Sequence, residues 1–311
     1  MSARAWIFMA ATAALWGASY MFIKVALDGG LSEGFIICAR TILGAMVLVP
    51  LALRAGALRP ILERRWWNLW LALAQVIVPF GLITYGENHI PSALAGILVA
   101  SAPLFVAVLA VWFDPAERSH GWGLVGVLIG MLGVVLLFGV DLGGGGEELL
   151  GGLMVLGAGL SYGIAVLVVK RGFAGVAPVG VAASTMVVSV IAWLPAALAS
   201  LPTHDPGAGA IASLITLGAG GTGVAFLFFY TLIADVGPAR ASVIAYIAPA
   251  FAVVYGVVLL DESLTAGTIA GLVLILGGSY LAAQAKAVRG APAVSRSGPS
   301  RSTAPEPARA R

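Results

Sequence analysis

The sequence predicts an all-α integral membrane protein with ten transmembrane helices, arranged as two inverted-topology repeats of five helices. Three observations lead to this fold class. Apolar segments of membrane-spanning length recur along the chain. Lys and Arg residues concentrate in the segments that connect the apolar stretches on one side of the membrane. The first half of the sequence is repeated in the second half at a nearly constant offset.

The apolar segments account for most of the composition. Hydrophobic residues make up 60% of the chain and charged residues 10%, whereas soluble proteins have about 45–50% and about 25%. The mean hydropathy is +1.02. The segments are close to the roughly 20 residues that a helix needs to cross about 30 Å of hydrocarbon. The ten predicted spans are 5–26, 34–53, 67–86, 92–112, 121–140, 150–169, 179–200, 210–233, 239–260 and 266–285.

The distribution of Lys and Arg predicts the orientation, because cytoplasmic loops carry the excess of basic residues. With a cytoplasmic N-terminus, 15 of the 17 Lys and Arg residues lie on the cytoplasmic side. Of the other two, Lys24 lies at an outer end and Arg40 inside the second span. Both termini are therefore expected in the cytoplasm. The basic character reflects this topology, and no nucleic-acid partner is expected.

An internal repeat sets the expected architecture. A shift of 146 residues aligns "ALWGASYMFIK" (14–24) with "LSYGIAVLVVK" (160–170), and it places Trp16 on Tyr162. The same shift aligns "SAPLF" (101–105) with "IAPAF" (247–251). Five helices per copy is an odd number, so the second copy enters the membrane from the opposite side, as in many transporters. The predicted units are a first repeat at 1–145, an inverted second repeat at 146–286 and a disordered cytoplasmic tail at 287–311.

The repeat also aligns two prolines, Pro103 and Pro249, near the middle of the fourth and ninth spans. Proline removes a backbone hydrogen bond and kinks a helix. A freed carbonyl group at membrane depth must find a partner or line a cavity. The symmetric pair therefore predicts two kinks that act as a gate beside a binding site, although each proline alone is compatible with an ordinary structural kink.

Several segments resemble a known family. They are "ALWGASYMFIK", "ICART", "PSALAGILVASAPLFVAVLAVWFDPAER" and "GPARASVIAYIAPAFAVVYGVVLLDESLTAGTIAGLVLILGG". Together they resemble the drug/metabolite transporter superfamily, EamA-type branch, and within it most closely the bacterial aromatic amino acid exporters. The resemblance covers residues 5 to about 285. One departure is "DPAER", where Asp114 and Pro115 stand in place of the usual Gly-Glu pair.

The resemblance implies a membrane carrier, either an exporter or a facilitator, that moves small metabolites across the bacterial inner (plasma) membrane. Amino acids, aromatic ones included, are the expected substrates, and alternating access around a central midplane cavity is the expected mechanism. The alternatives are a carrier for sugars, phosphorylated metabolites or drugs, and a polytopic membrane enzyme that acts on lipids. An enzyme would need clustered nucleophiles or acid–base groups near one interface, and the loops offer only dispersed acids.

Polar and aromatic residues inside the spans are the candidate substrate-binding residues. Trp16 lies too deep for an interfacial anchor, and Arg40 could bind a substrate carboxylate, stabilise a gate or pair with backbone carbonyl groups. A snorkelling role at the interface fits Lys24 and Lys170 better, since both lie at span ends. The full candidate set is Trp16, Tyr20, Arg40, Gln75, Ser101, Tyr162, Phe226, Tyr230, Ser242 and Tyr246.

The sequence also shows what is missing. No His, Cys and Asp cluster suggests a metal, no phosphate-binding loop occurs, and no cofactor is expected. No Asp or Glu lies well inside a span, Glu87 being at the edge of the third. Proton-coupled carriers usually keep such a carboxylate, so the sequence gives proton coupling little support, and facilitated diffusion is the alternative. The GxxxG pairs (Gly126 with Gly130, Gly267 with Gly271) fit packing within a monomer better than a homodimer face.

Overall fold

The computed structural model describes residues 1–113, 121–140 and 145–287, and every regular element in these ranges is helical. Asp114, Pro115 and the tail 288–311 lie outside the described residues. The helices are α1 Ala3–Asp28, α2 Glu33–Arg54, α3 Arg59–Glu63, α4 Arg65–Ala72, η1 Leu73–Ile77, α5 Val78–Gly86, α6 Ser92–Val99, α7 Ala102–Phe113, α8 Trp122–Val140, α9 Gly146–Gly172, α10 Pro178–Ala199, α11 Gly207–Ile215, η3 Thr216–Val224, α12 Ala225–Val236, α13 Pro238–Ala241, α14 Ile244–Leu259 and α15 Ala266–Ala287.

Within the described ranges, nine helices or helix runs are long and apolar enough to cross a membrane. They correspond to nine of the ten spans expected from the sequence. The ninth predicted span, 239–260, is divided into the short α13 and the shorter apolar helix α14. The division lies at Ser242 and Val243, where the Ala245 N–H donates to the Ser242 carbonyl group at 3.0 Å and tightens the first turn of α14.

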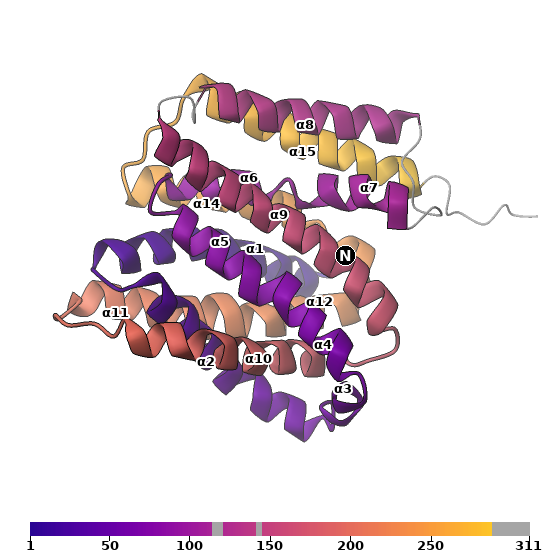
Figure 1. The fold of residues 1–311 in the computed structure, drawn as a ribbon. Helices are drawn as coiled ribbons and strands as arrows, with labels where there is room; N and C mark the ends of the chain where they lie inside the picture. Colours follow the sequence, from indigo (N-terminus) through magenta and orange to yellow (C-terminus); the bar gives the residue numbers. More distant parts are fainter. Residues whose placement is uncertain (114–120, 141–144, 288–311) are drawn as a thin grey trace, which may run out of the picture.

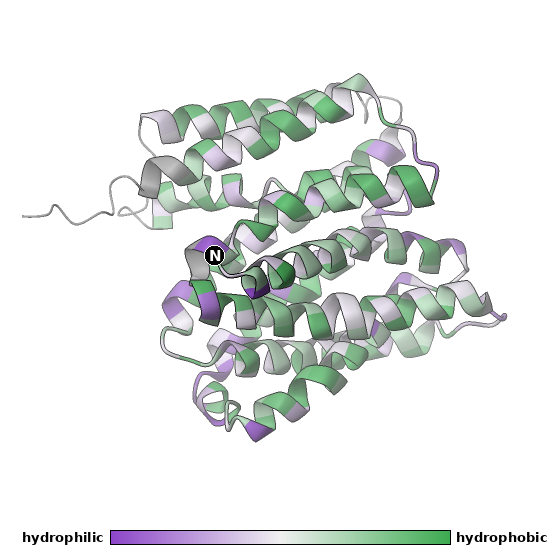
Figure 2. Cartoon of the chain, turned by 180° about the vertical axis from the view of Figure 1, so that it is seen from behind, coloured by the Kyte–Doolittle hydropathy of each residue, from purple (hydrophilic) through white to green (hydrophobic). Residues whose placement is uncertain are grey.

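The helices form one bundle of roughly antiparallel rods (Figure 1). The most extensive contacts pair α8 with α15, α2 with α10, α1 with α14, and α2 with η3. Hydrophilic residues gather at the helix ends, and the rods between them are mainly hydrophobic (Figure 2). The bundle therefore presents an apolar belt bounded by two polar ends, as a bilayer requires.

Glycine permits the closest of these helix pairs. A Cβ atom at Gly126 of α8 would lie 2.6 Å from the Ala282 nitrogen and 2.7 Å from the Gly278 oxygen of α15. The two backbones are thus in direct contact, as small residues allow in membrane helices. The Gly126–Gly130 pair therefore packs within the monomer, the option that the sequence favoured.

Exposed tryptophans mark one end of the bundle. They lie at the start of α1, the start of α4, the end of α7 and the start of α8, and comprise Trp6, Trp66, Trp67, Trp70, Trp112 and Trp122. Figure 1 shows the N-terminus, α3 and the end of α7 together at this end. Interfacial tryptophans form such belts at the lipid headgroup level.

Basic side chains fasten helices together at the same end. Arg4 pairs with Asp235 at 3.4 Å, joining the start of α1 to the end of α12. Arg64 donates to the Gly172 carbonyl group at 2.7 Å, and Arg171 donates to the Phe113 carbonyl group. These contacts join the ends of α3, α7 and α9.

Candidate functional site

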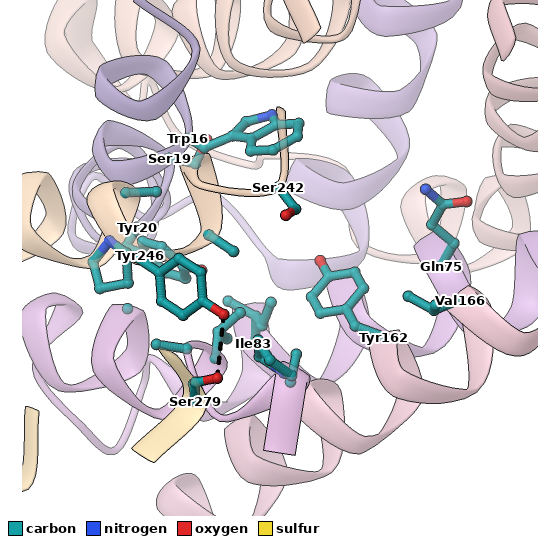
Figure 3. A pocket seen from close by; sticks show the side chains of 18 of the residues that line it. Trp16, Ser19, Tyr20, Gln75, Ile83, Tyr162, Val166, Ser242, Tyr246 and Ser279 are labelled. Carbon is teal, nitrogen blue, oxygen red and sulfur yellow. Dashed lines mark hydrogen bonds between the residues drawn. The ribbon is translucent and has the colours of Figure 1, made fainter. Parts of the chain in front are cut away.

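A cavity of about 620 Å³ occupies the centre of the bundle. Side chains from α1, α2, α5, α9, α12, α14 and α15 line it, together with residues of η1, η3, α6 and α7. A cavity of this volume is within the size range of small-molecule sites. Figure 3 shows Trp16, Ser242, Tyr246, Tyr162 and Gln75 surrounding the cavity from different helices.

The lining residues recur at one sequence offset. Ten pairs of them are separated by 146 positions, the offset of the internal repeat. The pairs are Trp16 and Tyr162, Tyr20 and Val166, Gln75 and Gly221, Phe80 and Phe226, Ile83 and Phe229, Gly96 and Ser242, Val99 and Ala245, Ala100 and Tyr246, Ala102 and Ala248, and Pro103 and Pro249. Equivalent positions in the two halves of the chain thus contribute to one cavity.

An aromatic wall forms around Trp16. The Trp16 ring lies 5.0 Å from Phe229 and 5.8 Å from Phe226 between centroids, in tilted and edge-on arrangements respectively. Such arrangements are the favoured geometries of aromatic pairs. Part of the Trp16 surface also faces the cavity. The ring is therefore held by its neighbours and still available to an apolar or aromatic ligand.

Among the residues that the structure describes, Arg40 is the one charged residue on the cavity wall. Its Nε–H donates to the Thr222 hydroxyl oxygen at 2.9 Å, and its guanidinium carbon lies 3.8 Å from the centre of the Phe80 ring. Thr222 in turn donates to the Leu217 carbonyl group at 3.1 Å, five residues earlier. The hydrogen bond to Thr222 and the contact with Phe80 fix the plane of the guanidinium group. The terminal nitrogens of a guanidinium match the geometry of a carboxylate.

Two π-helical segments shape the wall beside Arg40. η1 and η3 lie in the third and eighth spans, and the 146-residue offset carries Leu73, the start of η1, to position 219 within η3. A π-helical turn holds one extra residue and often marks a functional site. In η3 it brings Thr222 within reach of both the Leu217 carbonyl group and Arg40. Neither segment is marked by a pattern in the sequence.

Hydroxyl groups line other parts of the wall. The Tyr246 hydroxyl donates to the Ser279 carbonyl group at 3.3 Å. In Figure 3 Tyr246 and Ser279 lie on one side of the pocket, with Tyr162 and Gln75 on the other. Polar groups thus lie at several places on a mostly apolar surface, an arrangement that can orient an amphipathic solute.

Eight of the ten residues predicted to bind substrate line the cavity, as do both prolines. Ser101 and Tyr230 are not among the lining residues. The buried Ser101 hydroxyl donates to the Leu98 carbonyl group at 2.6 Å, and the Tyr230 ring packs against Phe226 and Phe229. Pro103 lies in the first turn of α7, directly after the break that ends α6, whereas α14 is continuous through Pro249.

Ser19, Phe80, Phe229 and Ser279 line the cavity but were not predicted. Phe80 could have been found from the sequence, because the repeat offset places it on the predicted residue Phe226. Phe229 lies at the same offset from Ile83, an apolar residue that carries no such signal. Ser19 and Ser279 carry no such signal, and each is one of many small polar residues in the spans.

Glu87 lies between the spans that end at Gly86 and begin at Ser92, and its side chain is completely buried. Burial and the nearby Glu262 carboxylate raise the pKa of Glu87 well above its usual range, with a smaller contribution from Asp28, while Lys24 and Arg40 act in the opposite direction. Hydropathy placed this residue at the edge of a span. It did not reveal that the surrounding helices enclose it.

No group of three or more His, Cys, Asp or Glu residues within the described ranges could hold a metal ion. The cavity itself offers aromatic faces, hydroxyl groups and one arginine. This chemistry suits reversible binding of a small amphipathic molecule.

A family model describes the whole helical region. The model of the EamA-like transporter family matches the chain twice, over residues 4–139 and 149–284. Each half of the chain therefore corresponds to one copy of the same family unit.

Individual relatives are similar to the chain over most of its length. An uncharacterized transporter of Bacillus subtilis strain 168 is 25% identical over 268 residues, covering 84% of this chain and 86% of the relative. A protein of Escherichia coli K12 named "Probable amino-acid metabolite efflux pump" is 27% identical over 285 residues, covering 86% and 90%. A Streptantibioticus cattleyicolor protein named "Probable terminal-alkyne amino-acid exporter" is 27% identical over 280 residues, covering 85% and 90%.

A solved crystal structure shares the fold. It superposes with a TM-score of 0.65 at 20% sequence identity, covering 91% of this chain and 98% of the other. The bundle, its central cavity and the two family matches lead to one conclusion: this chain is a membrane transporter that belongs to the EamA-like transporter family.

Proposed function

We propose that this protein carries amino acids, aromatic ones included, across the bacterial inner membrane by alternating access around the central cavity. The two halves of the chain, 1–145 and 146–286, act as inverted repeats that move relative to each other and expose the cavity to one side at a time. The protein acts as an exporter or a facilitator, and both termini lie in the cytoplasm.

The observation that carries this proposal is the pairing of the cavity residues. Ten pairs at the 146-residue offset line one cavity, which is expected when the pseudo-twofold axis of two repeats passes through the binding site. Inverted repeats with a midplane site between them are a common plan of secondary transporters. Such symmetry lets the same set of contacts close first one end of the cavity and then the other.

Helix contacts support the same symmetry. Gly17 of α1 packs against Ala248 and Phe251 of α14, and a Cβ atom there would lie 2.6 Å from the Ala248 oxygen. Gly163 of α9 packs in the same way against Phe105 of α7, with the corresponding distance to Phe105 Cβ at 3.1 Å. Gly163 and Gly17 are related by the repeat offset, and so are Phe105 and Phe251. Each half thus packs its first helix against the fourth helix of the other half.

The wall chemistry supports an amino acid as substrate. Arg40 can bind a carboxylate, and Trp16, Phe226 and Phe229 can pack against an apolar or aromatic side chain. Two relatives carry amino-acid export in their names. A phosphorylated solute would need several convergent cations, and within the described part of the chain Arg40 is the one Lys or Arg residue that lines the cavity.

The orientation proposal has its own support. The tryptophan belt and the basic residues Arg4, Arg64 and Arg171 share the end of the bundle that holds the N-terminus. Basic residues concentrate on the cytoplasmic side of membrane proteins. A relative in Escherichia coli K12 is named an inner membrane transporter.

Counterflow in proteoliposomes tests the function. Vesicles are loaded with one unlabelled compound from a panel of amino acids, and uptake of the same labelled compound is measured against vesicles without protein. We expect exchange of phenylalanine, tyrosine, tryptophan and leucine. The decarboxylated amine of each should exchange poorly, because it offers no partner to Arg40. Exchange of no amino acid in the panel would contradict the proposed substrate class.

A matched variant separates the role of Arg40 from folding. Arg40→Gln should lower exchange of the amino acids about tenfold or more, since charge-assisted hydrogen bonds are worth about 1.5–3 kcal/mol. It should leave the slow exchange of the amines unchanged. An equal loss for amines and amino acids, after normalisation to protein in the vesicles, would place Arg40 outside the binding site.

A further inference from the structure

One end of the central cavity is closed by an apolar cluster. The lining residues stop at Ile23 on α1 and Ile83 on α5, and both belong to this cluster. We call it the plug; its buried members are Ile23, Ala26, Leu31, Ile36, Ile83, Ala158, Ala210, Leu214 and Leu217. The plug residues come from α1, α2, α5, α9, α11 and η3, with Leu31 from the segment between α1 and α2. Opening this end of the cavity therefore requires several helices to separate.

Glu87 lies one helical turn beyond the plug residue Ile83. Its N–H donates to the Ile83 carbonyl group at 2.9 Å, and its side chain has no exposed surface. Neither carboxylate oxygen has a hydrogen-bond partner among the described residues. A buried, ionised carboxylate without donors is strongly unfavourable, so this geometry suits a neutral, protonated acid.

The neighbours of Glu87 hold the closed end together. Lys24 of α1 donates through Nζ to the Glu87 carbonyl oxygen at 3.1 Å and also faces Asp28 at 3.7 Å. The Glu262 carboxylate accepts from the Ser92 and Ala93 N–H groups at 2.7 and 2.9 Å, which joins the end of α14 to the start of α6. Both Glu262 carboxylate oxygens therefore accept hydrogen bonds from the start of α6 and cap that helix. The Glu87 carboxylate oxygens have no such donors among the described residues.

Further charged groups face this end from the helices around α5. Arg40 and Glu33 belong to α2, and Glu33 accepts from Asn88 at 2.6 Å. Glu147 and Glu148 begin α9, and exposed Glu147 pairs with His89 at 3.9 Å. Lys24 and Arg40 are the cations that act on the Glu87 charge. They would stabilise an ionised Glu87 once water can enter.

We propose that Glu87 is a proton-binding site, and that the bound proton holds this end of the cavity closed. With the proton in place, the neutral carboxyl stays buried behind the plug. When the proton leaves, the carboxylate favours a state in which the Lys24 contact to the Glu87 carbonyl group is broken and water solvates the carboxylate beside Lys24 and Arg40. The inference rests on the proposed function, because only a cavity with alternating access opens at this end.

The sign of the pH effect follows from linkage. The closed state binds the proton more tightly than the open state, so opening releases one proton. In the pH range between the two pKa values the ratio of open to closed molecules should rise on the order of tenfold per pH unit. Alkaline pH therefore opens this end, and acidic pH closes it.

A buried reporter cysteine measures the opening without any substrate. Ala26→Cys is introduced in a Cys38→Ser background in nanodiscs, and its rate of reaction with a charged methanethiosulfonate reagent is measured from pH 5 to pH 9. The thiol's own ionisation raises the rate equally in every variant. The parent should show an additional rise, on the order of tenfold per pH unit, that is absent when Glu87→Gln is added.

Controls at the same end define the role of Glu87. Glu147→Gln removes an exposed carboxylate, and His89→Gln removes the imidazole that faces it; both variants should keep the additional rise. An unchanged rise in Glu87→Gln, or a cysteine that reacts rapidly at every pH in that variant, would overturn the proposal. A cysteine that reacts at no pH in the parent would overturn alternating access and the proton site together.

Infrared spectroscopy of the wild-type protein gives a second test that needs no variant. A protonated carboxylic acid has a C=O stretch distinct from that of a carboxylate. We expect this band at pH 7, shifted when glutamate is labelled with ¹³C. Absence of the band at pH 7 would overturn the proposal even if Glu87→Gln failed to fold.

Discussion

Trp16 brings an aromatic ring to the middle of a membrane-spanning helix, where it packs against Phe226 and Phe229 and lines the cavity. The sequence predicts a role for Trp16 in substrate binding, because an indole at that depth lies away from both membrane interfaces. Its proposed role is to hold the apolar part of the substrate, opposite the hydroxyl groups of Tyr162 and Tyr246.

We expect Trp16→Ala to weaken transport of aromatic amino acids more than transport of threonine. Burial of a large apolar side chain contributes roughly 1.5–3 kcal/mol, so the affinity for aromatic substrates should fall about tenfold or more. Counterflow with a pair of labelled substrates measures the ratio. Trp16→Phe keeps a ring and should recover much of the selectivity. A uniform loss for both substrates would assign Trp16 to packing.

At the residue scale, the sequence reports how deep a residue lies in the membrane. Arg40, Trp16 and Gln75 were predicted from depth and line the cavity. Depth cannot tell which way a side chain points, so Ser101 and Tyr230 were included although they turn to neighbours. Hydropathy along one helix also cannot report burial by other helices, which is why Glu87 was treated as an edge residue.

At the element scale, the helices that meet across the two halves approach at glycine. Gly17 lies where α1 crosses α14, and the Ala248 oxygen occupies the space of a Cβ atom. The corresponding contact of Gly163 with Phe105 is slightly wider. These crossings fix how the wall residues of the two halves face each other.

Gly17→Ala should destabilise the protein, because the added methyl group forces α1 away from α14; overpacking typically costs about 1–3 kcal/mol. Gly139→Ala is the matched control, since Gly139 lies in helix α8 and nothing approaches the position of its Cβ atom. Thermal unfolding in detergent should show a lower midpoint for Gly17→Ala and an equal or higher midpoint for Gly139→Ala. Equal midpoints for both variants would contradict the close contact.

The prolines belong to the same scale. Pro103 follows the break between α6 and α7, and Pro249 lies within α14. Pro103→Ala and Pro249→Ala should each slow exchange more than they lower the amount of protein in the membrane, because both helices are proposed to bend as access changes. Initial counterflow rates per reconstituted protein measure this. Wild-type rates in both variants would leave the prolines a structural role only.

The π-helical segments η1 and η3 could not be predicted from the sequence. Each adds one residue to a turn within a continuously apolar span, so no change in periodicity marks it. Its position depends on contacts such as that of Thr222 with Arg40, which come from a different part of the chain.

At the scale of the whole molecule, the internal repeat was the most informative feature of the sequence. The two family matches lie 145 residues apart, and the paired residues that line the cavity lie 146 apart. Apolar segments of the expected length correspond to nine long helices of the described chain. The offset could be predicted because the repeated segments are visible in the sequence. The break before α14 could not, because it depends on backbone contacts that form only in the folded chain.

The central claim is that one cavity is exposed alternately to the two sides of the membrane. A cysteine at Ala248, which lines the cavity, in a Cys38→Ser background tests it most directly. In oriented proteoliposomes a membrane-impermeant thiol reagent should modify Ala248→Cys when added from either side, in separate experiments, and an exchanged amino acid should slow both reactions. Modification from one side alone, at every substrate concentration, would contradict alternating access.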